Sequence, residues 1–199
     1  DNRTELMASL GLAQWSHGDI ADSELILHAY EKWGEHAPKK LRGDFAFAIW
    51  DVRARVLFCA RDHCGVKPFY YYRSAGSFVF ASEIKALLTM RGVPRRLNVM
   101  KVADYLTHNF EDRVGTFYRD ILRLPAGHSL TVRGAEFRLQ SYDTLDPSRE
   151  IRLRSDAEYS EAFREHFGQA VRCRLRSAFP VGSLLSGGLD SSSIVGMAR

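Results

Sequence analysis

The sequence predicts an α+β domain followed by the start of an α/β nucleotide-binding domain. Helical and extended patterns are segregated over residues 1–142 instead of alternating, which is typical of the α+β class. A long amphipathic helical pattern opens residues 155–199, and an apolar run with a glycine- and serine-rich turn comes after it. The polar stretch at 143–154 separates the two patterns, so we expect it to be a linker.

The elements of the first domain follow from side-chain periodicity and from turn residues. An amphipathic helix is expected at 22–33, because its apolar residues recur every three or four positions and Gly34 ends the pattern. Two further helices are predicted at 82–91 and 99–108, with Ser82 and Asn98 as their caps. Aromatic and branched residues predict strands at 45–50, 56–60, 69–72, 78–81, 128–132 and 137–142, the last two joined by a turn at Arg133-Gly134.

The second domain begins with a helix, expected at 155–177. Ser155 and Glu158 have the spacing of a capping box, and aromatic residues follow at helical intervals. The apolar run at 181–185 is then predicted to form a buried strand, which stops at a glycine turn and restarts as a helix.

The run Ser-Gly-Gly-Leu-Asp-Ser-Ser-Ser at 186–193 is the most informative part of the chain. Adjacent glycines let the backbone approach an anion, serine hydroxyls add donors, and the following helix directs its positive end toward the site. A Walker loop would need a lysine here, and the run has Asp190 instead. Because Mg²⁺ prefers carboxylates together with phosphate oxygens, we interpret the run as a nucleotide phosphate site with magnesium. The alternative is a turn whose small residues serve packing only.

Composition narrows the class of protein. No run of about 18 apolar residues predicts a membrane span and no charged-then-apolar start predicts a signal peptide, so we expect a cytoplasmic protein with no membrane partner. Three cysteines without Cys-x-x-Cys spacing and dispersed histidines support neither a disulfide framework nor a zinc site. The formal charge of +4 is too small and too scattered to favour nucleic acid as a partner.

Four strings of the first domain stand out, at 41–51, 60–71, 78–87 and 124–128. In this order, and ahead of the 186–193 run, they resemble the bacterial type of glutamine-hydrolysing asparagine synthetase. The 186–193 run itself resembles the pyrophosphate loop of the N-type ATP pyrophosphatases. The resemblance implies a class II glutaminase domain, which is an N-terminal-nucleophile αββα sandwich, here truncated at its start. The beginning of a synthetase domain would follow it.

The resemblance also implies roles for individual residues. Asp22 matches the aspartate that pairs with the α-ammonium of bound glutamine. The N-terminal cysteine nucleophile is expected to precede Asp1, so no catalytic residue is assigned within the chain. The resemblance places Leu184 at the adenine side of ATP and Asp190 at magnesium. The residues that match those holding pyrophosphate are Ser186, Gly187, Gly188, Ser191 and Ser192.

Two acidic residues also have structural interpretations. Asp22 is equally well placed to cap the helix that follows it. Glu83 is assigned to the first turn of its helix, in preference to a role in orienting the base of the ammonia route.

The segment between the second and third predicted strands is expected to be structural. A tight loop through Gly65 and Pro68 would be fixed by Arg61, Asp62 and Lys67. Cys64 is expected to be a small buried filler and not a nucleophile, because no base lies near it in the sequence.

The function implied by the resemblance is part of a glutamine-dependent asparagine synthetase. Glutamine hydrolysis would supply ammonia to a β-aspartyl-adenylate made from aspartate and ATP, with release of AMP and pyrophosphate. One alternative is a related ligase of the β-lactam synthetase or peptide macrocyclase type with a reduced glutaminase domain. Another is a non-catalytic nucleotide-binding scaffold. Retention of Asp22 favours the synthetase, a homodimer is left open, and the chain alone is expected to be inactive.

Overall fold

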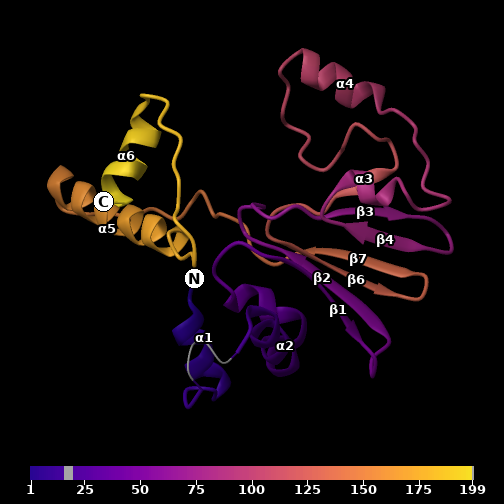
Figure 1. Cartoon of the computed structure of the whole chain (residues 1–199), viewed down its shortest axis with the longest axis horizontal. Helices are drawn as coiled ribbons and strands as arrows, with labels where there is room; N and C mark the ends of the chain where they lie inside the picture. The colour runs from indigo at the N-terminus through magenta and orange to yellow at the C-terminus, as the bar shows by residue number, and fades with distance from the viewer. Residues whose placement is uncertain (16–19, 199) are drawn as a thin grey trace. The chain divides into compact units, whose positions relative to one another are not determined.

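Aromatic and β-branched residues build two antiparallel sheets in the computed structural model, which describes residues 1–15 and 20–198 (Figure 1). The larger sheet has the strand order β1-β2-β6-β7 and the smaller one β4-β3-β5. Every pairing within them is antiparallel. The strands are β1 Ala46–Asp51, β2 Val56–Arg61, β3 Tyr70–Arg73, β4 Phe78–Ala81, β5 Ile121–Arg123, β6 His128–Arg133 and β7 Glu136–Ser141.

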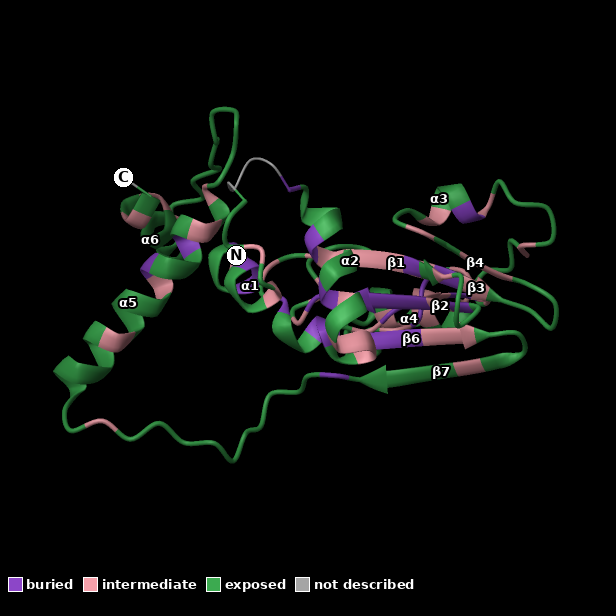
Figure 2. Ribbon diagram, turned by 90° about the horizontal axis from the view of Figure 1, so that it is seen from below, coloured by how far each residue is buried: buried purple, intermediate pink, exposed green. Residues whose placement is uncertain are grey.

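The two faces of β2 contribute to two different layers of the core. Cys59 packs with Tyr71 and Leu130, so this face of the larger sheet lies against the smaller sheet. Phe58 and Ala60 point the other way, as the period of two along a strand requires. Figure 2 shows β2 largely buried, whereas β7 at the edge is mostly exposed.

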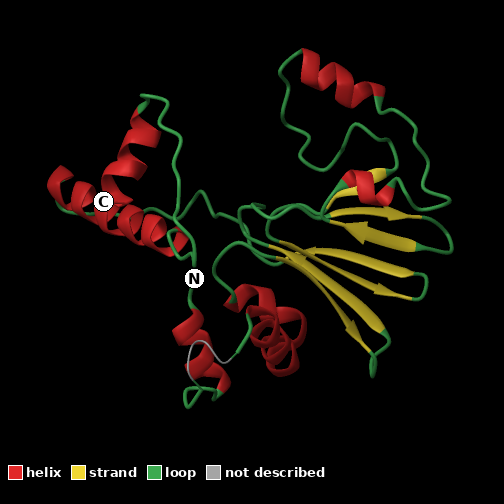
Figure 3. Cartoon of the chain, viewed as in Figure 1, coloured by secondary structure: helices red, strands yellow, loops and turns green. Residues whose placement is uncertain are grey.

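Helices cover the outer face of the larger sheet. The helical elements here are α1 (Arg3–Leu10), α2 (Asp22–Trp33) and the 3₁₀ helix η1 (Gly34–Lys40). The ring of Tyr30 on α2 stacks on Phe58 of β2, with ring centroids 5.3 Å apart. The short helix α3 (Ile84–Leu87) lies against β3 and β4. Figure 3 shows the segregation of helices from strands, which confirms the α+β class.

The chain divides into two compact units, Asp1–Leu145 and Asp146–Arg199. The second unit contains α5 (Asp156–Arg174) and α6 (Leu189–Ala198), which pack against each other. Ser155 caps α5 as predicted, because its side chain accepts a hydrogen bond from the N–H of Glu158. In a complete capping box the Glu158 carboxylate would accept the N–H of Ser155. Here it accepts the N–H of Arg154 instead. No described helix is long and apolar enough to cross a membrane.

Most predicted elements are confirmed to within a residue or two, and the exceptions have physical reasons. The predicted strand at 181–185 is wrong: these residues form no regular element and are exposed, because the described part of the second unit contains no strand with which they could pair. The helix expected at 82–91 is confined to α3, and Glu83 occupies the cap position predicted for Ser82. Neither α1 nor β5 was predicted, since α1 has little amphipathic pattern and β5 has only three residues.

Candidate functional site

The sharp turn at Gly187 is the main feature of the second unit. Gly187 has a φ of +82°, in the left-handed region that glycine adopts without steric cost. The helix α6 begins two residues later, at Leu189, so Asp190 lies in its first turn. The predicted glycine turn followed by a helix is therefore confirmed, although no strand precedes it.

Serine hydroxyls close this turn on itself. The Ser191 hydroxyl accepts a hydrogen bond from the N–H of Ser186 at 3.3 Å and donates to the carbonyl oxygen of Gly188 at 3.2 Å. The Ser186 and Ser191 hydroxyl oxygens are 3.0 Å apart. The N–H of Gly188 donates to the Ser186 hydroxyl at 3.4 Å. These side chains hold the backbone of the turn in place before any ligand is present.

The same turn leaves backbone donors available. Within residues 1–15 and 20–198, the N–H groups of Gly187, Leu189, Asp190 and Ser191 have no hydrogen-bond acceptor. Unpaired N–H groups at a helix N-terminus attract anions, because they carry the positive end of the helix dipole. The arrangement can therefore hold a phosphate group. Leu184 is 95% exposed, so it contacts no partner that would define an adenine pocket.

The turn at Gly187 offers one carboxylate as a ligand for a divalent cation. Asp190 is the acidic residue of the first turn of α6. Within the described part of the chain, no group of three His, Cys, Asp or Glu residues could hold a metal ion by itself. Mg²⁺ bound with a nucleotide needs only one or two carboxylates besides phosphate oxygens, so this donor set fits nucleotide-bound magnesium.

Asp22 lies at the start of α2 and does not cap it. The cap residue is Ala21, and the Glu24 carboxylate accepts its N–H at 2.8 Å. The cap interpretation of Asp22 is therefore wrong, because the helix begins at Asp22 itself. Its side chain is 74% exposed and accepts a hydrogen bond at 2.5 Å from the buried guanidinium of Arg3.

The loop after β2 has the structural role predicted for it. The Asp62 carboxylate, on a residue only 1% exposed, accepts hydrogen bonds from the N–H groups of Cys64, Val66 and Lys67. The Arg61 guanidinium donates to the carbonyl oxygens of Gly65, Lys67 and Leu124. The side chains of Arg61 and Asp62 thus hold the backbone of the loop through hydrogen bonds. Lys67 contributes through its main-chain N–H and carbonyl groups and not through its ammonium.

The burial of the cysteine side chains differs from the prediction. Cys64 is exposed and not a buried filler, because its side chain projects outward from a loop whose backbone turns inward to Asp62. The buried cysteine is Cys59, on the face of β2 that meets the smaller sheet. Burial raises the pKa of the Cys59 thiol to about 12, so it stays protonated and inert.

Glu83 precedes its helix and does not belong to the first turn. It occupies the cap position of α3, and its side chain makes no capping hydrogen bond. The carboxylate instead pairs with the ammonium of Lys85 at 2.6 Å. Both side chains are mainly exposed, so the pair contributes little to stability.

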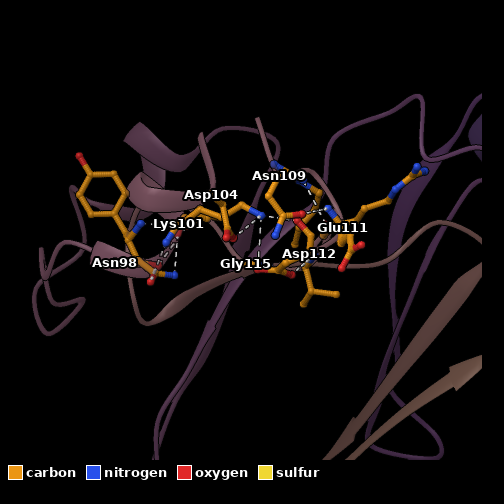
Figure 4. Close-up of polar contacts among 12 residues, drawn as sticks. Asn98, Lys101, Asp104, Asn109, Glu111, Asp112 and Gly115 are labelled. Atoms are coloured by element: carbon orange, nitrogen blue, oxygen red, sulfur yellow. Dashed lines mark hydrogen bonds and ion pairs between the residues drawn. The ribbon is translucent and has the colours of Figure 1, made fainter. Parts of the chain in front are cut away.

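A polar cluster that the sequence did not indicate anchors α4 (Val99–Leu106), as Figure 4 shows. Lys101 is only 16% exposed, and its ammonium lies 3.4 Å from the Asp112 carboxylate and 3.9 Å from that of Asp104. Asn98 caps the helix as predicted, accepting the N–H of Lys101 at 3.3 Å. The Asp112 carboxylate also accepts the N–H of Gly115 at 2.9 Å. These contacts organise the loop after α4.

Comparison with protein families matches both parts of the chain. Residues 2–143 match a family model described as a glutamine amidotransferase domain. Residues 162–199 match a family model described as asparagine synthase. The second match includes α6 and the turn at Gly187.

Individual relatives cover nearly the whole chain. Asparagine synthetase 3 of Bacillus subtilis, named as glutamine-hydrolysing, is 35% identical over 179 residues, which are 89% of this chain and 29% of that protein. Asparagine synthetase 1 of the same organism is 31% identical over all of this chain and 31% of its own length. Amidase chry2 of Gibberella zeae is 34% identical over 180 residues, which are 89% of this chain and 26% of the amidase. The chain thus spans about a third or less of these relatives.

Proposed function

Because the chain belongs to the glutamine amidotransferase domain family, we propose that it forms the glutaminase domain and the first phosphate-binding element of a glutamine-dependent asparagine synthetase. Glutamine hydrolysis supplies ammonia, and aspartate is activated by ATP as a β-aspartyl-adenylate. Formation of the adenylate releases pyrophosphate, and ammonia then displaces AMP to form asparagine, while the hydrolysed glutamine leaves as glutamate. The match of residues 162–199 to asparagine synthase supports joining the two activities in one protein.

The observation that carries the proposal is the turn at Gly187. Its unpaired N–H groups lie at the N-terminus of α6, beside Asp190. Pyrophosphate gains negative charge as it leaves the α-phosphate, so preorganised N–H donors at that position lower the barrier. We assign pyrophosphate binding to Ser186, Gly187, Gly188, Ser191 and Ser192.

The remaining assignments follow the same proposal. We assign Asp190 to nucleotide-bound magnesium, which supplies positive charge to the phosphate oxygens. Leu184 is assigned to the adenine side of ATP. Asp22 is assigned to the α-ammonium of glutamine, because its exposed carboxylate can pair with a cation. No residue of this chain is assigned as the nucleophile.

The similarity to a fungal amidase favours a second candidate. Amidase chry2 is 34% identical over 180 residues, close to the identity of the bacterial synthetases. The related function is an ATP-dependent ligase that activates a carboxylate other than that of aspartate, as in a β-lactam synthetase or a peptide macrocyclase. Both candidates use the turn at Gly187, so the acceptor distinguishes them.

The test uses the full-length gene product with glutamine, aspartate and ATP. We expect asparagine by mass spectrometry and one pyrophosphate for each asparagine formed. Asp190→Ala should abolish pyrophosphate release and leave glutamine hydrolysis unchanged, whereas Ser193→Ala, at the serine of α6 that is not assigned to pyrophosphate, should affect neither. Pyrophosphate release that does not depend on aspartate would favour the second candidate. Loss of both activities in a folded Asp190→Ala protein would contradict separate sites.

A further inference from the structure

The positively charged side chain of Arg3 is almost completely buried. The residue is 9% exposed, although it begins the short helix α1 near the start of the chain. Its Nη1 donates to Oδ1 of Asp22 at 2.5 Å, and its Nη2 donates to the carbonyl oxygen of Ile20. A buried guanidinium is costly unless it is paired, so these contacts constrain the conformation of the segment.

The acceptors at Ile20 and Asp22 lie at the start of α2. The carbonyl oxygen of Ile20 fixes the backbone two residues before the helix, and the Asp22 carboxylate is the first side chain of the helix. Together with Arg3, these residues form the corner between α1 and α2. The planar guanidinium of Arg3 therefore holds both the backbone at Ile20 and the side chain of Asp22. A guanidinium does this better than an ammonium, because its donors diverge in a fixed plane.

The pairing leaves Asp22 able to bind a second cation. A carboxylate has about four lone-pair positions, so it can accept from Arg3 and from an ammonium group together. The side chain of Asp22 is 74% exposed, whereas that of Arg3 is 9% exposed. A ligand from solvent can therefore reach the carboxylate, while the guanidinium behind it is largely inaccessible.

We propose that Arg3 is a positioning residue for glutamine recognition, which orients the Asp22 carboxylate toward the α-ammonium of the substrate. The inference rests on the function proposed for Asp22. It makes a counterintuitive prediction about charge. Removal of Arg3 takes away a positive charge that would repel an ammonium group at Asp22, so simple Coulomb attraction predicts tighter binding of that ammonium. Positioning predicts weaker binding, because the carboxylate loses its fixed orientation.

The test measures glutamine hydrolysis by the full-length gene product. We expect Arg3→Met to raise KM for glutamine about tenfold and to leave kcat within about twofold, since the contact acts on substrate binding. Arg3→Lys keeps the charge and one donor, so its KM should lie between those of the wild type and of Arg3→Met. In an Asp22→Asn background, Arg3→Met should raise KM no further, because both residues act through one carboxylate.

The matched control is Lys32→Met. The Lys32 ammonium donates to the carbonyl oxygen of Ser9 at 2.6 Å, so it also links α2 to α1, but it does not contact Asp22. An equal rise in KM for Lys32→Met would show that any loosening of this corner has the same effect, and would overturn the inference. An unchanged or lower KM for Arg3→Met would also overturn it.

The outcomes separate this inference from the proposed function. If Asp22→Asn leaves KM unchanged, or if the wild type does not hydrolyse glutamine, the assignment of Asp22 fails and the role of Arg3 fails with it. If Asp22→Asn raises KM and Arg3→Met does not, only the role of Arg3 fails. If Arg3→Met does not fold, Arg3→Lys decides: a raised KM supports positioning and an unchanged KM overturns it.

Discussion

The guanidinium of Arg61 donates a hydrogen bond of 2.7 Å to the carbonyl oxygen of Leu124, which lies 63 residues further along the chain. Arg61 ends β2 in the larger sheet, and Leu124 follows β5 in the smaller sheet. The bond therefore connects the ends of the two sheets, whose facing sides also pack through apolar side chains. Asp62 continues the link, because its carbonyl oxygen accepts the N–H of Gly127 at 2.9 Å.

Replacement of Arg61 should destabilise the first unit. Arg61→Met leaves three carbonyl oxygens without their donor, and we expect a loss of about 3 kcal/mol in the free energy of unfolding. Urea denaturation followed by tryptophan fluorescence measures the change. Arg53→Met, in the exposed turn between β1 and β2, is the control and should have little effect. A similar stability for both variants would contradict the structural role of Arg61.

A methyl group at Gly127 should be poorly tolerated. Gly127 has a φ of +65°, and an added Cβ would lie 2.6 Å from the carbonyl oxygen of Asp143. Gly134 is a matched control, since it has a φ of +56° and no atom within 4 Å of an added Cβ. We expect Gly134→Ala to cost about 1 kcal/mol, from the left-handed backbone alone. Gly127→Ala should cost clearly more, and equal losses in urea denaturation would refute the close contact.

The stabilising effect of Asp112 should depend on pH. Backbone N–H groups of Gly115 and Val114, and then Lys101, hold the pKa of Asp112 below its ordinary value of 3.8. A carboxylate whose pKa is lower in the folded state stabilises the protein above the unfolded pKa, and this contribution is lost as the pH falls through the folded pKa. Asp112→Asn should therefore lower the melting temperature at pH 7.

The difference between Asp112→Asn and the wild type should begin to shrink as the pH falls below about 4, the ordinary pKa of the carboxyl, and should vanish only below the lowered folded-state pKa, where the wild type loses the charge as well. Glu111→Gln removes an adjacent exposed carboxylate and is the control. Melting temperatures between pH 3 and pH 7, measured by circular dichroism, provide the test. A constant difference across this range would show that the Asp112 charge is not involved.

The three thiols should react with alkylating reagents at different rates. Cys64 is exposed, Cys173 is intermediate and Cys59 is fully buried with a raised pKa. We expect iodoacetamide to label Cys64 first in the native protein, and to label Cys59 only when the chain unfolds. Peptide mass spectrometry after timed labelling identifies the modified residue. Early modification of Cys59 would contradict the packing of the two sheets.

Local patterns in the sequence were sufficient for most of the secondary structure of the first unit, although they missed α1 and β5 and made the helix at α3 too long. The aromatic and branched residues of β1 and β2 and the apolar face of α2 are features of neighbouring residues, so the sequence by itself reveals these elements. The turn at Gly187 is likewise local, because adjacent glycines and serines favour it wherever the segment lies.

Tertiary contacts decided what local patterns could not. Residues 181–185 have the composition of a strand but form none, because a strand is stable only beside another strand. Cys59 and Cys64 lie five positions apart, and only the packing of the sheets makes one buried and the other exposed. The pairing of Arg3 with Asp22 joins two helices across 19 positions, a distance at which side-chain patterns carry no information about contact.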